Sequence, residues 1–288
     1  MARRFGTAPF AFAAVLLAAA FGYQQFLASV LLRERASPPS WVRFIPAQTA
    51  QAIDRSEPLF ASPSLRLLFA HKALEDGDLA LAARRIARLP PSPQRFALQG
   101  RLAEARGDAA AAARAYLAAG DAPEVERRVS ALASAGRLDE ALALQRELVA
   151  RLQRDSSQVD ALANAWLESG RLEQAWAYRA GMQSVAGHAA AERAAGAYAR
   201  AVALAPLSAL YLISAGSQAL NLDDLGAATA YFTRAAQADP TAADAYAGLG
   251  EADLRRGDRS AARDELRRAE RAGPNRESVR RLAAELGP

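Results

Sequence analysis

The stretch "ADAYAGLGEADLRRGDRSAARDELRRAERAGPNR", residues 243–276, carries the clearest structural pattern in the sequence. Its two halves are rich in Ala and place apolar residues three and four positions apart, which is the spacing of an amphipathic helix. Gly257 separates the halves, and Pro274 follows the second one. Glycine readily adopts the left-handed conformation that ends a helix, and proline cannot continue one. The stretch therefore predicts two helices joined by a tight turn at Gly257.

The same features recur upstream at a step of 34 residues. Four sets of residues keep this step: Pro206, Pro240 and Pro274; Ala194, Ala228 and Ala262; Ala201, Ala235 and Ala269; and Tyr198, Phe232 and Leu266. A fixed period of this length indicates a repeat architecture, in which each unit buries its apolar face against its neighbours.

These residues resemble the tetratricopeptide (TPR) repeat, which has a large residue at position 4, small residues at positions 8, 20 and 27, a bulky residue at 24 and Pro at 32. The best matches are segments 209–242 and 243–276, and the latter supplies Tyr246, Leu249, Gly250, Ala262, Leu266, Ala269 and Pro274. The resemblance covers residues 63–286, and it is looser before about residue 190. It implies an all-α, TPR-type α-solenoid of about six helix hairpins with an N-terminal transmembrane helix and a C-terminal capping helix at 276–286.

The upstream repeats are expected to use the same glycine turn. Gly77, Gly107, Gly136 and Gly170 each precede an alanine five residues later, and we place a turn between two helices at each of them. Residues 186–205 are expected to form a helix whose partner stays open. It either belongs to a degenerate repeat that starts near Ala175 or is an unpaired insert that shifts the register.

Arg-Gly-Asp, the tripeptide that cell-adhesion receptors recognise, occurs at residues 106–108 and 256–258. The turn explains each of its residues, because Gly ends the first helix and Asp suits the start of the second one. Arg complements the dipole at the end of the first helix. We therefore assign both tripeptides to the turn, and adhesion remains an alternative only if Asp258 projects freely.

The N-terminal region predicts a membrane segment. After a basic flank at residues 1–8, the stretch "PFAFAAVLLAAAFGYQQFLASVLL" at 9–32 has no charged residue and is long enough to cross a bilayer. A cleavable signal peptide is the alternative interpretation. A Pro-rich spacer at 33–62 follows. Because the Ala and Arg bias suggests a bacterial source, we expect a single-pass protein of the bacterial inner membrane with its TPR domain in the periplasm.

Composition argues against several classes of function. The chain has no cysteine and two histidines, so we expect no metal site, no cofactor and no catalytic residues. Its net charge is +5, but residues 1–55 account for +4 of this and the rest of the chain for +1. A nearly neutral body lacks the basic patch of a nucleic-acid-binding protein, so no nucleic acid partner is expected.

The resemblance implies that the first helices of the repeats line a concave groove for a protein or peptide partner. No repeat carries the Lys and Asn pair with which chaperone-binding members hold a C-terminal carboxylate. The candidate groove contacts, chosen by repeat position, are His71, Arg101, Asp160, Asn164, Ser217, Asn221, Asp244 and Glu251. The Arg-rich stretch 255–281 is either a solvated face or a docking site for an anionic polysaccharide, lipid or acidic protein. Its candidate contacts are Arg263, Arg267, Arg268 and Arg271.

The function expected from these features is that of a non-enzymatic, membrane-tethered scaffold that binds partner proteins in assembly or export at the bacterial cell envelope. Similar single-pass bacterial TPR proteins serve translocation, cytochrome maturation, and cell-wall or polysaccharide machinery. The alternative is an accessory protein of exopolysaccharide or O-antigen biosynthesis or export that contacts an anionic glycan. A degenerate enzyme or cofactor-binding module is disfavoured, because no catalytic motif is present.

Overall fold

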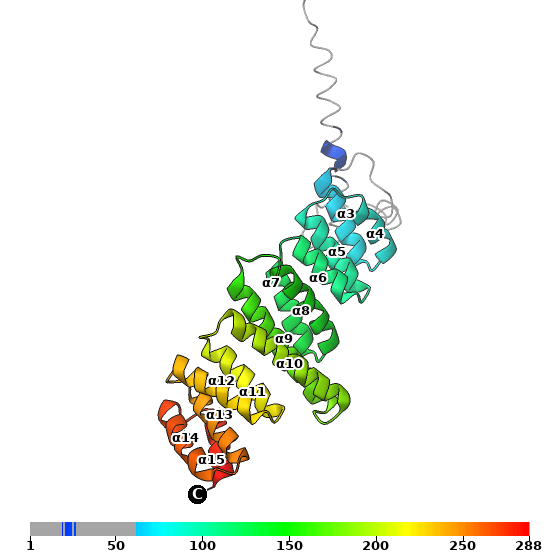
Figure 1. The fold of residues 1–288 in the computed structure, drawn as a ribbon. Coiled ribbons are helices and arrows are strands. Elements are labelled where there is room, and N and C mark those ends of the chain that lie inside the picture. Colours follow the sequence, from blue (N-terminus) through cyan, green and yellow to red (C-terminus); the bar gives the residue numbers. More distant parts are fainter. Residues whose placement is uncertain (1–18, 20, 25, 27–61, 288) are drawn as a thin grey trace, which may run out of the picture. The chain divides into compact units, whose positions relative to one another are not determined.

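The structure is a computed structural model, and it describes residues 19, 21–24, 26 and 62–287. Residues 62–287 form thirteen α-helices, named α3 to α15, and no strand occurs in this part of the chain (Figure 1). Contacts divide the helices between a first unit that ends at Asp121 and a second unit that begins at Ala122.

The first unit contains two helix hairpins. Its helices are α3 (Pro63–Glu75), α4 (Leu79–Ala87), α5 (Pro93–Ala105) and α6 (Ala109–Ala118). Ser62 and Ser92 cap α3 and α5, and in each case the hydroxyl accepts a hydrogen bond from the backbone amide three residues later. Proline at the first helical position needs no amide donor, so it suits the start of both helices.

The second unit contains four hairpins and a last single helix. Its helices are α7 (Ala122–Ser134), α8 (Leu138–Leu152), α9 (Val159–Ala180), α10 (Val185–Leu204), α11 (Ala209–Asn221), α12 (Leu225–Ala238), α13 (Ala243–Arg255), α14 (Arg259–Ala272) and α15 (Glu277–Leu286). We call the first helix of each hairpin helix A and the second helix B. The predicted class, an all-α array of six hairpins with a C-terminal capping helix, is confirmed.

The glycine turn between helices A and B is also confirmed at most of its predicted places. Gly77, Gly107, Gly136 and Gly257 have φ between 73° and 87°, which is the left-handed region that favours glycine. In the last turn the Asp258 carboxylate accepts a hydrogen bond of 2.9 Å from the amide of Ala261, so this side chain caps α14. The Arg-Gly-Asp tripeptide is therefore part of the turn.

The turn predicted at Gly170 is wrong, because α9 continues through this residue to Ala180. A Cβ atom at Gly170 would lie 2.5 Å from a ring atom of Tyr198, so the residue is glycine because helix α10 packs tightly against it. Gly216 has the same relation to Phe232, at 2.9 Å. Gly170 therefore lies inside helix A, where the repeat needs a small residue.

This register also corrects the prediction for residues 186–205. Gly216 and Phe232 are 16 residues apart in sequence, whereas Gly170 and Tyr198 are 28 apart. Helices α9 and α10 therefore form one hairpin with twelve additional residues at the end that contains its turn, and α10 is neither an unpaired insert nor part of a repeat that starts near Ala175. The turn lies after Gly181, which has φ 83°.

The additional residues are packed against the neighbouring hairpins. Ala177, Ala190 and Ala191 are fully buried, with Trp176 and Leu222 packed against them. The Trp176 indole donates a hydrogen bond of 2.8 Å to the carboxylate of Asp139, which follows the turn between α7 and α8. These contacts hold the lengthened end in place on both the preceding and the following hairpin.

The predicted location is wrong. A bilayer crossing needs about 20 predominantly apolar residues in one helix, and within the described part of the chain no helix meets both the length and the apolarity. A single-pass protein of the bacterial inner membrane with a periplasmic TPR domain is therefore not supported. The predicted flank at 1–8, segment at 9–32 and spacer at 33–62 lie outside the described residues, apart from residues 19, 21–24, 26 and 62.

Candidate functional site

A cavity of about 610 Å³ runs along the A helices of the second unit, and we call it the A-helix groove. It is lined from α9, α11, α13 and α15, with the Phe232 ring of α12 below. Its polar lining includes Ser217, Asn221, Asp244, Glu251, Arg255, Glu277, Ser278, Arg281 and Glu285. The groove therefore combines three successive A helices with the capping helix, which follows α14 as a further helix A would.

Small residues on α13 make room for the groove. A Cβ atom at Gly248 would lie 2.3 Å from the Phe232 ring, so only glycine lets this ring fill the space between α11 and α13. Ala247, next to it, is buried and lines the same groove. Phe232 is almost fully buried and so gives the groove a rigid apolar base.

Charged side chains cross the groove from α13 to α15. The Glu251 carboxylate pairs with Arg255 at 2.6 Å and with Arg281 at 2.8 Å. Arg255 also donates a hydrogen bond of 2.6 Å to the carbonyl of Leu220, near the end of α11. Asp244 accepts a hydrogen bond of 2.5 Å from Ser278. These bonds fix α15 against α13 and hold both carboxylates in place.

Carboxylates outnumber arginines in this groove. Four carboxylates line it, those of Asp244, Glu251, Glu277 and Glu285, against two arginines, Arg255 and Arg281. Asp244 also pairs at 3.4 Å with Arg276, which does not line the groove. Glu277 and Glu285 are exposed and make no ion pair within residues 62–287. The groove thus offers two free carboxylates beside two that already have partners.

Residues 219–286, which include α12 to α15, match the family model of the tetratricopeptide repeat. This part of the chain therefore carries tetratricopeptide repeats. Repeats of this kind generally serve as scaffolds for protein–protein interaction.

Several solved TPR structures are similar to the chain at low identity. YrrB, described as a TPR protein with an unusual peptide-binding site, is 16% identical over 76% of this chain and 91% of its own, with a TM-score of 0.43. TTC0263, a thermophilic TPR protein of Thermus thermophilus, is 18% identical over 75% and 98%, with a TM-score of 0.45. PilW, a type IV pilus biogenesis factor, is 14% identical over 76% and 97%, with a TM-score of 0.44. None of the curated proteins is a match.

The A-helix groove brings together four of the eight predicted contacts, namely Ser217, Asn221, Asp244 and Glu251. Their TPR positions predicted this grouping, and their role in binding stays a prediction. The side chains from α15 were not predicted as contacts. The signal for them was the capping helix itself, because a helix in the place of a seventh helix A presents its residues to the same groove.

The other four predicted contacts lie elsewhere. In the first unit, Arg101 Nη1 lies 2.5 Å from His71 Nε2, so these two side chains contact each other. On α9, the Asn164 carbonyl oxygen accepts a hydrogen bond of 2.7 Å from the Tyr211 hydroxyl. Burial raises the pKa of Tyr211, and the nearby Asp160 carboxylate adds to this rise. None of these residues lines the A-helix groove.

The predicted anionic-surface contacts lie on α14, and all four are exposed. Arg267 pairs with Asp264, and Arg268 pairs with Glu265 at 3.0 Å. Burial raises the pKa of Glu265, while the charge of Arg268 acts in the opposite direction. Two of the four arginines are thus engaged by carboxylates of their own helix, and the binding of an anionic surface by this patch stays a prediction.

Proposed function

We propose that the chain is a non-enzymatic adaptor that binds a partner protein in the A-helix groove, and that the bound segment is extended and carries Lys or Arg side chains. The observation that carries this proposal is the excess of carboxylates in the groove, with Glu277 and Glu285 free of ion pairs within residues 62–287. A cationic segment would gain two new charge contacts there, whereas an acidic segment would meet repulsion.

The apolar lining supports a peptide as the occupant. Ile213 and Tyr178 border the charged residues, and Tyr178 is 57% exposed. Exposed aromatic side chains are enriched in interaction sites, because they bury a large area at a small entropic cost. Such a groove would hold a partner segment during the assembly or export of other proteins, which is the setting we propose for it.

A titration with two labelled peptides tests the proposal. Both have twelve residues and the same apolar positions, and they differ only in carrying Arg and Lys or Asp and Glu. We expect the cationic peptide to bind the wild type, as followed by fluorescence anisotropy. Because an exposed charge contact contributes about 0.2–1 kcal/mol, E277Q combined with E285Q should weaken binding by roughly 3- to 10-fold.

The matched control is E192Q combined with E270Q, which removes two exposed carboxylates that do not line the groove. It changes the net charge by the same amount and should leave binding unchanged. Equal losses in both double variants would mean that net charge alone attracts the peptide. Failure of the cationic peptide to bind the wild type would contradict the proposal.

A further inference from the structure

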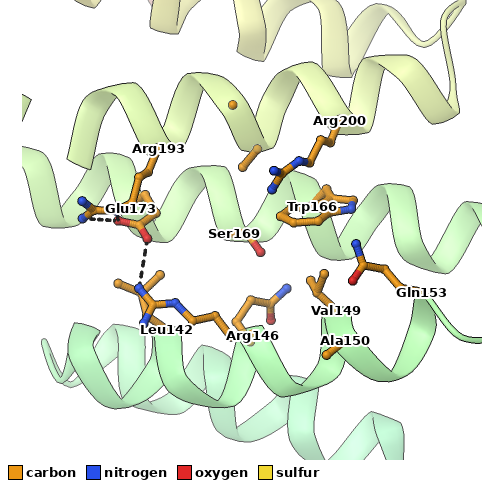
Figure 2. A pocket seen from close by; sticks show the side chains of 13 residues that line it. Leu142, Arg146, Val149, Ala150, Gln153, Trp166, Ser169, Glu173, Arg193 and Arg200 are labelled. Carbon is orange, nitrogen blue, oxygen red and sulfur yellow. Dashed lines mark hydrogen bonds and ion pairs between the residues drawn. The ribbon is translucent and has the colours of Figure 1, made fainter. Parts of the chain in front are cut away.

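A second groove lies along B helices of the second unit. It is a cavity of about 500 Å³ between α8 and α10, with α9 beneath, and we call it the B-helix groove (Figure 2). Arg146 of α8 and Arg193 and Arg200 of α10 line it, together with one acidic residue, Glu173 of α9. Arginine therefore dominates this groove, in contrast to the A-helix groove.

Glu173 holds two of the arginines in position. Its side chain is only 8% exposed; one oxygen accepts from Arg146 at 3.3 Å and the other pairs with Arg193 at 2.8 Å (Figure 2). The two arginine side chains are 67% and 50% exposed. Since a guanidinium has five N–H donors, each arginine keeps donors for a further acceptor after it has bound Glu173.

The third arginine is oriented by an aromatic ring. The Arg200 guanidinium lies 4.4 Å from the centre of the Trp166 ring, which is a cation–π contact. A guanidinium stacked in this way still presents its N–H groups in its own plane. Arg200 is exposed and makes no hydrogen bond or ion pair to the part of the chain that the structure describes. It is thus a preoriented donor without an acceptor.

Gly196 has no side chain and so leaves the α10 side of this groove open. It lies on α10 between Arg193 and Arg200, and the spacing of three and four residues puts all three on one face of the helix. A Cβ atom at Gly196 would meet no other atom within 4 Å, so no packing contact requires glycine here. Glycine inside a helix is nevertheless less stable than alanine. The glycine leaves the groove open between Arg193 and Arg200.

We propose that the B-helix groove binds an acidic segment of a partner protein. Its carboxylates pair with Arg146, Arg193 and Arg200, and an apolar side chain lies over Gly196 against Leu142 and Val149. Three guanidiniums and one carboxylate leave the groove with an excess of positive charge. Arg193 and Arg200 lie seven residues apart on one helix, which is about 10 Å along its axis, so separate carboxylates along one segment can pair with both, whereas a single phosphate cannot.

The first test places a bulky side chain at Gly196. G196L should weaken binding of the acidic twelve-residue peptide by tenfold or more, while G196A should raise Tm by a few degrees, as a helical Gly-to-Ala change does. The matched control is G226L, which places the same side chain at an exposed glycine of α12. We expect G226L to bind the peptide as the wild type does. Unchanged binding by G196L would overturn the proposal.

The second test separates the groove from net charge. R146Q combined with R200Q leaves the pair of Glu173 with Arg193 intact and should weaken binding of the acidic peptide by roughly tenfold. R263Q combined with R271Q removes the same charge from α14 and should have no effect. Equal losses in both would overturn the proposal, as would tighter binding of a phosphopeptide or a sulfated polysaccharide than of the acidic peptide. Binding of the cationic peptide should not change, so this proposal and the proposed function can fail separately.

Discussion

Helix α9 contributes to both grooves of the second unit, yet the side chains that meet in the two grooves differ in charge. Tyr178 and Gln174 face the A-helix groove, where carboxylates are in excess, and Glu173 and Trp166 face the B-helix groove, where arginines are in excess. The A-helix groove follows from repeat position. The B-helix groove depends on which turns of α8, α9 and α10 lie beside each other, and the contacts of Glu173 with both neighbouring helices fix this alignment.

The largest expected effect comes from a change inside the α9–α10 hairpin, at Gly170. In G170A the new methyl group would lie 2.5 Å from the Tyr198 ring, so α9 and α10 must move apart. Because overpacking of a core costs about 1–3 kcal/mol, we expect the free energy of unfolding to fall by about 2–3 kcal/mol in urea titrations. Binding of both peptides should weaken.

G216A is the matched variant for this comparison, because Gly216 contacts the Phe232 ring in the same way. Phe232 lines only the A-helix groove. G216A should therefore weaken binding of the cationic peptide and leave binding of the acidic peptide unchanged. A G170A protein as stable as the wild type would contradict the assignment of Gly170 to the packed interior of the hairpin.

A smaller effect concerns pH. Burial raises the pKa of Tyr198 above its usual value near 10, so the folded state keeps this proton at a pH at which the unfolded state releases it. Its contribution to stability is therefore complete below about pH 10 and is lost as the pH rises above that value, by at most about 1.4 kcal/mol per pH unit. Urea midpoints between pH 8 and 11 should fall less steeply in Y198F than in the wild type. Y178F, in which an exposed ring loses its hydroxyl, should keep the wild-type slope.

The smallest expected effect is a loss of stability that leaves peptide binding in both grooves unchanged. In D258A helix α14 loses the carboxylate that accepts from the amide of Ala261, and the loss of such a cap costs about 1 kcal/mol. D258N should retain most of this stability, because asparagine is an equally good cap. Both peptides should bind D258A as tightly as the wild type. A loss of peptide binding in this variant would mean that stability, and not groove chemistry, governs the titrations.

Much of the fold was predictable because local chemistry fixes it. Gly257 ends a helix and Asp258 begins the next one, and this pair marks the turn without reference to the rest of the chain. Gly170 shows the limit of such reasoning. A glycine followed by arginine, with alanine five residues later, looks the same in a turn and in a helix that faces a ring. Only the contact with Tyr198, 28 residues away, distinguishes the two.

The two grooves also differ in how far the sequence predicts them. Ser217, Asn221, Asp244 and Glu251 were predicted to face one groove, because repeat position determines the face of helix A on which a residue lies. The B-helix groove was not predicted. It requires Arg146 and Arg193 to meet Glu173, which is 27 residues from the first and 20 from the second. Neither separation equals the 34-residue period, so the repeat pattern gives no signal for this cluster, and only the tertiary contacts bring the three side chains together.

A cross-titration of both peptides against both double variants tests whether one unit carries two grooves of opposite charge preference. We predict that E277Q with E285Q weakens binding of the cationic peptide only. R146Q with R200Q should weaken binding of the acidic peptide only. The contradicting result would be reciprocal shifts, in which each variant weakens one peptide and strengthens the other by a similar factor. Net charge alone would then explain the binding, and the two grooves would not be separate sites.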